Sequence, residues 1–342
     1  MIRAYKSIGP HVFDVDNYTL VPIRYDDRNK ILLWRNEQIN ILRQKKPLTQ
    51  VEQDKYFTTV IDNLFEEDHP SQLLWSLLYS DNLIGYGGLV HIDWESRNAE
   101  ISFLTEPNRA RDSIQFANDW TIFLKMLYKI AYLHLDFQKI FTYSYGIRTD
   151  LFPVLESFGF IKEATLKNHI VVDNFTTDVC IHSFFFRQIK IRRATILDID
   201  QYYYWANDLE VRNNSYKGDL ITLDEHQKWF SKKILSEDCF LYYFTDANDV
   251  PVGQVRIECI HKNDSVIGVS VDKSFRTKYL GSKMVLVASN EFLKTNPTYR
   301  LIAFIKVENK KSYKTFINAG FTLEAMVIHE GINSYKMVKK NI

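Results

Sequence analysis

Hydrophobic and polar residues follow two periods along this chain, one typical of strands and the other typical of helices. The clearest passage is 266–284, where Ile267, Val269 and Val271 share one face of a period-two pattern. A basic turn with one glycine comes next. Apolar residues at helical spacing then follow: Met284, Val285, Leu286, Ala288, Phe292 and Leu293. The passage therefore predicts a half-buried strand, a turn and a helix.

The first half of the chain predicts an ordered series of elements by the same patterns. A helix at 26–42 contains Trp34-Arg35-Asn36, and Thr49 and Glu52 have the spacing of a capping box that opens the next helix. The other elements expected here are strands at 18–23, 73–80, 84–93 and 99–104, a helix at 118–133, a strand at 139–145, a short helix at 151–157, and strands at 160–163 and 177–185.

The second half repeats this order. A helix expected at 196–211 carries Trp205 and Asn207 in the place of Trp34 and Asn36, and the capping-box spacing recurs at 222–225. Strands are expected at 189–192, 240–245 and 253–260, and the segment SVIGVSV matches AEISFLT. Because several anchors recur in one order at a near-constant separation, the chain contains an internal duplication. We therefore expect two domains, residues 1–187 and 188–342.

Composition narrows the class of protein. The chain has 342 residues, 46% of them hydrophobic, which is enough for two globular domains. A formal net charge of +1 argues against a dedicated nucleic-acid partner, and the absence of any run of about 18 apolar residues argues against a membrane span. The 3 cysteines have no spacing typical of a disulfide framework or a metal site. We expect a cytoplasmic protein.

The turn after residue 271 has the chemistry of an anion site. Lys273, Arg276 and Lys278 precede Gly281, at the point where the predicted helix begins. The first amides of a helix have no partner within it, and the aligned peptide dipoles favour an anion there. Together with the nearby cations, the turn predicts a site for a diphosphate.

The segment Arg276-Thr277-Lys278-Tyr279-Leu280-Gly281 resembles the Arg/Gln-x-x-Gly-x-Gly/Ala signature of the GNAT superfamily of acyl-CoA-dependent N-acetyltransferases. The element order is similar to the GNAT fold over nearly the whole chain, twice. The resemblance implies an α/β (α+β mixed-sheet) protein of two tandem GNAT-like domains, with acetyl-CoA (coenzyme A) as its cofactor. One departure is Tyr279 in place of the first glycine, where a positive φ would strain a tyrosine.

The resemblance implies which residues hold the cofactor. Backbone groups of Val269 and Val271 would bind the pantetheine arm in a gap between the strands at 267–271 and 301–306. Asn309 and Ser312 match the family's Asn-x-x-Ser/Ala segment and would contact the same arm, although an N-cap explains them equally. The turn that would bind the diphosphate consists of Arg276, Thr277, Lys278, Tyr279, Leu280, Gly281 and Ser282.

Catalysis of acetyl transfer needs a base for the amine and an acid for the leaving thiolate. Many members of the family use a tyrosine as the acid where this chain has Phe316, so Tyr313 is the substitute candidate, with simple packing as the alternative. Glu258 is the candidate base, or a structural partner of Arg256. His226 titrates in the useful range and is a second catalytic candidate, or a structural histidine.

The candidate acceptor-binding residues lie near His226 in the sequence. Trp229 is three residues further on and so shares its helix face, and Asn214 and Ser215 precede that helix. The segment 211–230 resembles the branch of the family that acetylates amino sugars in pseudaminic acid synthesis. The same subgroup includes ribosomal-protein N-terminal acetyltransferases.

The first half lacks the residues of such a site. The segment 105–114 has no glycine and contains acids, and the place of Asn309 falls near Arg148, with Leu151 in the place of Ser312. We interpret this half as a degenerate copy with a supporting role. The alternative is a second acyltransfer site, for which Glu100 and His91 are candidates.

These observations lead to one expected function and two alternatives. We expect an acetyl-CoA-dependent N-acetyltransferase whose acceptor is a small-molecule amine, a nucleotide-linked amino sugar for surface glycans, and which is a monomer or homodimer. The alternatives are a protein N-terminal acetyltransferase and a non-catalytic tandem pseudo-acetyltransferase that binds a ligand.

Overall fold

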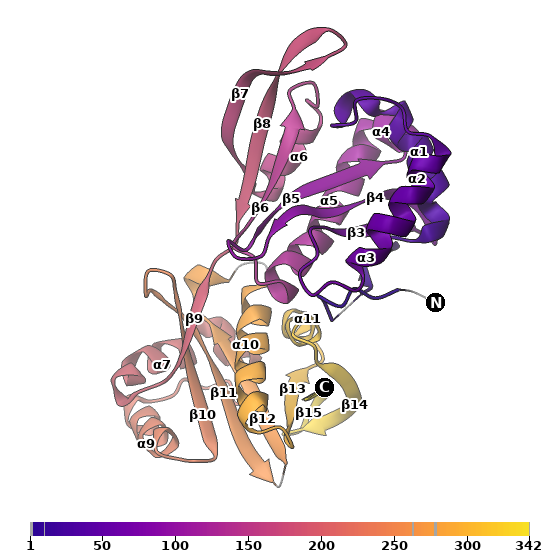
Figure 1. Cartoon of the computed structure of the whole chain (residues 1–342). Helices are drawn as coiled ribbons and strands as arrows, with labels where there is room; N and C mark the ends of the chain where they lie inside the picture. The colour runs from indigo at the N-terminus through magenta and orange to yellow at the C-terminus, as the bar shows by residue number, and fades with distance from the viewer. Residues whose placement is uncertain (1–2, 10, 262, 277–278, 342) are drawn as a thin grey trace. The chain divides into compact units, whose positions relative to one another are not determined.

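The computed structural model describes residues 3–9, 11–261, 263–276 and 279–341. Its contacts divide the chain into two compact units, Met1–Phe186 (unit 1) and Arg187–Ile342 (unit 2). Both are mixed α/β units, as Figure 1 shows. None of the helices within these ranges is long and apolar enough to cross a membrane.

Unit 1 contains a sheet with the strand order β1-β2-β3-β4-β5-β6-β8-β7. Neighbouring strands are antiparallel except for β5 and β6, which are parallel. The strands are β1 (Phe13–Val15), β2 (Tyr18–Pro22), β3 (Leu73–Tyr79), β4 (Asn82–Asp93), β5 (Asn98–Thr105), β6 (Lys139–Tyr145), β7 (Ile161–Val172) and β8 (Phe175–Phe185). The helices are η1 (Tyr25–Asp27), α1 (Arg28–Glu37), η2 (Ile39–Ile41), α2 (Gln50–Tyr56), η3 (Phe57–Ile61), α3 (Asp62–Leu64), α4 (Pro107–Arg111), α5 (Ser113–Lys129), η4 (Ile130–His134) and α6 (Leu151–Phe158).

Unit 2 repeats this topology with the order β14-β15-β13-β12-β11-β10-β9, and β12 and β13 form the parallel pair. Its strands are β9 (Ile189–Arg193), β10 (Cys239–Asp246), β11 (Pro251–His261), β12 (Asp264–Val271), β13 (Arg300–Lys306), β14 (Thr322–His329) and β15 (Ile332–Lys340). Its helices are η5 (Ile196–Asp198), α7 (Ile199–Ala206), α8 (Leu209–Asn214), α9 (Leu223–Ile234), η6 (Lys273–Phe275), α10 (Leu280–Thr295) and α11 (Lys310–Asn318). The fold class that the sequence predicted is confirmed.

The sheet of unit 2 is buried on both faces, and alternation along β10 shows why. Tyr242 and Phe244 belong to the core under α10 and α11, whereas Leu241 and Tyr243 belong to a second core under α7 and α9. Successive side chains of a strand point to opposite faces, so one strand contributes to both cores. The two layers of helices therefore cover both faces of the sheet at its centre.

The repeated sequence anchors make the same contacts in both units. Asn36 accepts from the Leu48 amide and donates to the Leu48 carbonyl, both at 2.8 Å. Asn207 does the same with Ile221, at 2.8 and 2.9 Å. Complete capping boxes open α2 at Thr49 and α9 at Thr222. The Trp-x-Asn motif therefore fixes the chain that leads into the following capped helix.

The expected helix at 196–211 was wrong as a single element. It divides into α7 and α8, because the Asn207 side chain is used in the loop contact and the Asp208 carboxylate caps Val211 N at 3.1 Å. The expected helix at 26–42 likewise ends at Glu37. Apolar spacing continues across both breaks, so periodicity did not reveal them.

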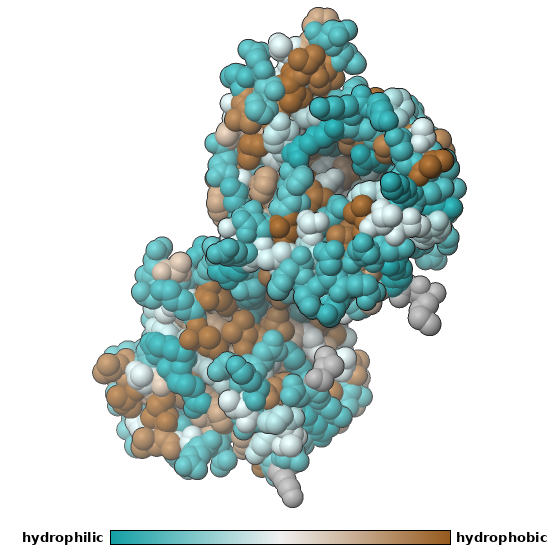
Figure 2. Space-filling model, in the orientation of Figure 1, coloured by the Kyte–Doolittle hydropathy of each residue, from teal (hydrophilic) through white to brown (hydrophobic). Residues whose placement is uncertain are grey.

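The β7–β8 hairpin is longer than the sequence predicted. Its turn residues Asp173 and Asn174 have φ values of 48° and 66°, as a tight two-residue hairpin turn requires. Most of β7 is exposed, so it lacks the alternation that burial of one face produces. Hydrophobic side chains such as Val171 and Phe175 are also exposed here. Figure 2 shows brown patches on an otherwise mainly polar visible surface.

Candidate functional site

The parallel strands of unit 2 separate partway along their length. Pairing of β12 with β13 is limited to Asp264–Arg300, Ser265–Leu301 and Val266–Ile302. Beyond Val266, β12 remains paired with β11, and β13 remains paired with β15. The described backbone therefore diverges between 267–271 and 303–306, and groups on the facing edges are left for a ligand.

Helix α10 begins close to the open end of β12. Its N-cap residue, Tyr279, forms no side-chain hydrogen bond to the first turn and has a φ of 62°. The backbone here has the positive φ that a glycine would tolerate, and the tyrosine carries the strain. Thr277 and Lys278 lie outside the described residues. The first amides of α10, from Leu280 to Ser282, have no acceptor within the helix.

The Asp272 side chain holds the turn between β12 and α10 in place. This buried carboxylate accepts from Trp205 Nε1 at 2.9 Å and from the Ser274 amide at 2.9 Å. The tryptophan of the Trp-x-Asn motif therefore positions the turn. It links α7 to the residues that precede the helix N-terminus.

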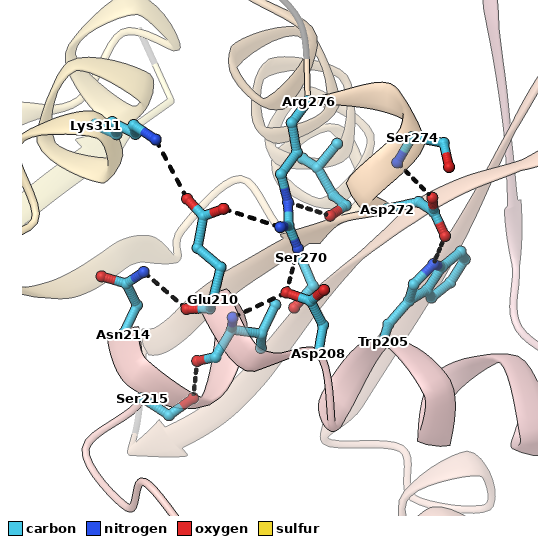
Figure 3. Close-up of polar contacts among 12 residues, drawn as sticks. Trp205, Asp208, Glu210, Asn214, Ser215, Ser270, Asp272, Ser274, Arg276 and Lys311 are labelled. Carbon is cyan, nitrogen blue, oxygen red and sulfur yellow. Dashed lines mark hydrogen bonds and ion pairs between the residues drawn. The ribbon is translucent and has the colours of Figure 1, made fainter.

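Arg276 lies across the open end of β12, as Figure 3 shows. Its Nη1 donates to Glu210 Oε2 at 2.9 Å, its Nη2 contacts Asp208, and its Nε donates to the Val271 carbonyl at 3.2 Å. Burial opposes ionisation of Asp208, but the hydrogen bonds from Arg276 and the Val211 amide outweigh it and lower the pKa. The guanidinium that we expected at a diphosphate is thus held by two carboxylates.

The other expected cofactor contacts surround the same gap. Val269 and Val271 lie on the diverging part of β12, with side chains packed toward the α10 core. Asn309 Oδ1 accepts from the Ser312 amide at 3.0 Å, so Asn309 is the N-cap of α11. Both residues stand where β13 ends, and their cofactor contacts stay a prediction.

The family's tyrosine position is closed in this chain. Phe316 is buried in the core, with its ring centroid 5.0 Å from that of Phe321. Tyr313, one turn earlier on α11, packs at 4.5 Å between centroids against Tyr335 and is only partly buried. Its hydroxyl stays the candidate acid.

Glu258 lies on β11 opposite Val266, level with the point where β12 and β13 separate. Arg256 Nε is 3.0 Å from its Oε1, and Lys233 contacts its Oε2. Both contacts are those expected if Glu258 is a structural partner of neighbouring cations and not a base. A base role would require Glu258 to exchange these cations for the acceptor amine.

His226 lies in the aromatic core between α7 and α9. It is buried, its Nε2 is 2.9 Å from the Ile199 carbonyl, and its ring is 5.8 Å from those of Trp229 and Phe230. Burial lowers the pKa of His226, although the Ile199 carbonyl opposes the shift. These contacts are the ones expected of a structural histidine, and its catalytic role stays a prediction.

The expected acceptor residues do not form one cluster. Asn214 donates to the Glu210 carbonyl and Ser215 to the Val211 carbonyl, so both close the end of α8 (Figure 3). Trp229 instead packs beside Arg256, whose guanidinium carbon is 5.5 Å from its ring centroid. A surface hollow of about 650 Å³ lies at the end of β13, lined by Val307, Glu308, Met326, Gly331, Ile332 and Asn333.

Unit 1 has the same divergence of parallel strands but a different helix start. Pairing of β5 with β6 stops at Glu100–Phe141. The extra helix α4 follows β5, and Asp112 then caps α5, accepting from the Ile114 and Gln115 amides at 3.0 and 3.1 Å. A carboxylate of the chain therefore occupies the donors that a diphosphate would need.

The candidate residues for a second site in unit 1, Glu100 and His91, contact other side chains of the unit. Arg43 binds both oxygens of Glu100, at 2.8 and 2.9 Å, and lies 3.1 Å from His91 Nε2. Arg148, near the place of Asn309, stacks 5.4 Å from the Trp120 centroid, and burial lowers its pKa to about 10. These contacts favour the degenerate interpretation of this half, which stays a prediction.

Sequence reasoning missed the carboxylates around Arg276. Asp208 directly follows Asn207, just as Glu37 directly follows Asn36, and Glu37 pairs with Arg111 in unit 1. The recurring acid after Trp-x-Asn was the signal that could have predicted one of them. Glu210 has no counterpart in the first half and no such signal.

Comparison with known proteins supports the duplication. Two family profiles, both described as "Acetyltransferase (GNAT) domain", match residues 20–181 and 188–322. Solved structures with a similar fold include a spermidine N-acetyltransferase from Vibrio cholerae in complex with CoA and spermine (15% identity, 45% of this chain and 96% of that chain, TM-score 0.42). Another is the aminoglycoside acetyltransferase AAC(6')-Ib in complex with coenzyme A and kanamycin (19% identity, 45% of this chain and 95% of that chain, TM-score 0.40).

A comparison with curated protein sequences found no match. The family matches fall on the two halves separately, one within each compact unit. They agree with the repeated strand order and the repeated divergence of the parallel pair. The chain therefore belongs to the GNAT acetyltransferases and carries two such domains in tandem.

Proposed function

We propose that unit 2 binds acetyl-CoA between β12 and β13 and transfers its acetyl group to the amino group of a small acceptor. The observation that carries this proposal is the start of α10, which has no side-chain cap at the open end of a diverging strand pair. Such a helix start offers orphan amides and a favourable dipole to a diphosphate.

The residues around the gap fit this donor. Amides of Leu280, Gly281 and Ser282 would bind the diphosphate, and backbone groups of Val269 and Val271 would bind the pantetheine arm. A Cβ added at Gly281 would meet the Val271 and Thr315 side chains only at 3.4 Å or more, so the fold itself does not require a glycine here. We infer that the missing side chain lets a phosphate come close to the backbone amides. Acetyl-CoA supplies an activated thioester, and the chain orients it.

Protons would be handled by one residue on β11, level with the point of divergence, and by one on α11. Glu258, level with Val266, would accept the proton of the amine directly or through water, and Tyr313 would protonate the thiolate. A Cβ added at Gly268, opposite Arg256 on the neighbouring strand, would meet no atom within 4 Å. That open space favours the approach of an acceptor over this part of β12.

The acceptor that we propose is a nucleotide-linked amino sugar, as the likeness of 211–230 to the amino-sugar branch suggests. The hollow of about 650 Å³ at the end of β13 offers room for such a ligand. A protein N-terminus is the alternative acceptor. A non-catalytic role is favoured by two observations, the strained Tyr279 and the buried Phe316.

Thiol release from acetyl-CoA, measured against a panel of amino-sugar nucleotides and N-terminal peptides, separates these functions. Release with an amino-sugar nucleotide supports the proposal, and release with peptides alone supports the alternative acceptor. Binding of acetyl-CoA without release with any acceptor would leave only the non-catalytic role.

A further inference from the structure

Glu210 lies between two cations at the open end of the strand pair. Its Oε2 is 2.9 Å from Arg276 Nη1, and its Oε1 is 3.4 Å from Lys311 Nζ. Figure 3 shows Arg276 and Lys311 facing this carboxylate from opposite sides. A carboxylate with one oxygen on each cation occupies the place that a bridging phosphate would take.

The two cations belong to the two sides of the gap. Arg276 follows β12, and Lys311 lies in the first turn of α11, which follows β13. Glu210 reaches them from α8. In the same helix, the backbone carbonyl of Asn213 accepts from Lys306 Nζ, at the end of β13, at 3.1 Å. The helix therefore spans the open end, with its acidic side chain at the centre.

The two carboxylates on Arg276 are held differently. The side chain of Asp208 is 16% exposed and also caps the Val211 amide, so it has a fixed second role. The side chain of Glu210 is 44% exposed, and its second partner, Lys311, is 89% exposed. Exposed ion pairs contribute little because water competes with them. Glu210 is thus the carboxylate that a stronger anion displaces.

We propose that Arg276 and Lys311 form a two-cation clamp for a phosphate group and that Glu210 competes with this phosphate for the clamp. This inference rests on the proposed function, because it places the phosphate at the same open end. The phosphate belongs either to the acyl donor or to a nucleotide-linked acceptor. Asp208 keeps the arginine in position during the exchange.

Comparison with unit 1 supports different roles for Asp208 and Glu210. The pair between the acid after Trp-x-Asn and an arginine after the central strand occurs in both units, as Glu37–Arg111 and Asp208–Arg276. The third residue after the asparagine is Ile39 in unit 1 and Glu210 in unit 2. The competing carboxylate therefore occurs only in the unit whose helix start has no side-chain cap.

The experiment is calorimetric titration of the full chain at low and high salt, with coenzyme A in one arm and a uridine diphosphate amino sugar in the other. The variants are Glu210→Gln and Lys311→Gln. Asp224→Asn is the matched control, because Asp224 forms an exposed ion pair with Lys228 at 2.7 Å on α9.

Glu210→Gln should tighten binding of one ligand by up to about fivefold, the ratio that an exposed ion pair supports. Lys311→Gln should weaken binding of the same ligand and reduce its salt dependence. The arm that shifts identifies the source of the phosphate. Equal affinities across all variants would overturn the clamp while leaving the proposed function intact. No binding of coenzyme A to any variant would overturn the proposed function itself.

Discussion

The two units share one scaffold and differ in the helix starts that follow the central strand. In both, parallel strands diverge after three paired positions, and a Trp-x-Asn motif fixes the loop before a capped helix. In unit 1, the short helix α4 follows the strand, and Asp112 then caps the long helix α5. In unit 2, Tyr279 stands at the corresponding start and provides no cap.

The contacts that recur in both units are those that hold the fold, whereas the helix start, where we propose that a ligand binds, differs between them. The asparagine contacts and capping boxes recur because each half needs them to order its loops. The start of the helix after the central strand need not be the same in both units, since a side-chain cap, water or a ligand can satisfy its first amides. In unit 1, the Asp112 carboxylate satisfies two of these amides.

The largest effect is expected from a change at the unit 2 turn. The double variant Arg276→Glu, Gly281→Val should lose acetyl-CoA binding by on the order of a hundredfold, because it adds a negative charge and bulk beside the phosphate amides. Calorimetry measures the affinity. The matched control is Arg111→Glu in unit 1, which breaks the equivalent ion pair with Glu37 and should leave the affinity unchanged. Unchanged binding in the double variant would remove the site from this turn.

The next effect concerns the shared scaffold. Asn36→Ala and Asn207→Ala each remove two hydrogen bonds to one loop residue, and Asn36→Ala also removes the bond from Gln44 Nε2. Each variant should lower the free energy of unfolding by at least about 2 kcal/mol. Hydrogen exchange followed by mass spectrometry should show faster exchange at the start of α2 for the first variant and of α9 for the second. Loss confined to one of the two variants would contradict equal roles for the motif.

A smaller effect tests the cap of unit 1. Asp112→Ala removes the side-chain acceptor of the Ile114 and Gln115 amides and should cost about 1 kcal/mol of stability. Hydrogen exchange at the start of α5 measures the loss. Added inorganic phosphate serves as the comparison, since an anion that binds the uncapped start should restore part of the protection. Unaltered exchange in the variant would show that Asp112 is not the group that satisfies these amides.

The smallest effect is a pH dependence in unit 2. Burial lowers the pKa of His226, so between pH 6.5 and its folded pKa the unfolded chain binds a proton that the folded chain does not. Stability therefore falls as the pH drops through that window, and His226→Gln should flatten the slope. The exposed His261 gives the control variant His261→Gln.

Chemical denaturation at pH 7 and pH 5 measures this slope. Turnover of His226→Gln, measured alongside, decides the remaining question about this residue. Normal turnover with a flattened slope fits a structural histidine. A large loss of turnover with the slope unchanged would instead restore the catalytic role.

Sequence patterns predicted most of the scaffold because burial imposes periodicity. The strands around the core and the duplication follow from residues that pack, whereas the gap between the strands at 267–271 and 301–306 came from the family resemblance. The break after Asn207 and the long β7–β8 hairpin were missed, since side-chain hydrogen bonds and exposed strands leave no apolar period. At the site, the sequence placed the turn between the strand and the helix and singled out Tyr279, whose φ is 62°. The carboxylates on Arg276 were missed because they come from a segment distant in sequence.

The stoichiometry of acetyl-CoA binding to the full chain tests the central claim most directly. We predict one molecule per chain by calorimetry, retained in Arg111→Glu and lost in the Arg276→Glu, Gly281→Val double variant. Two molecules per chain, or one molecule that survives the double variant, would contradict the assignment of the site to the helix start of unit 2.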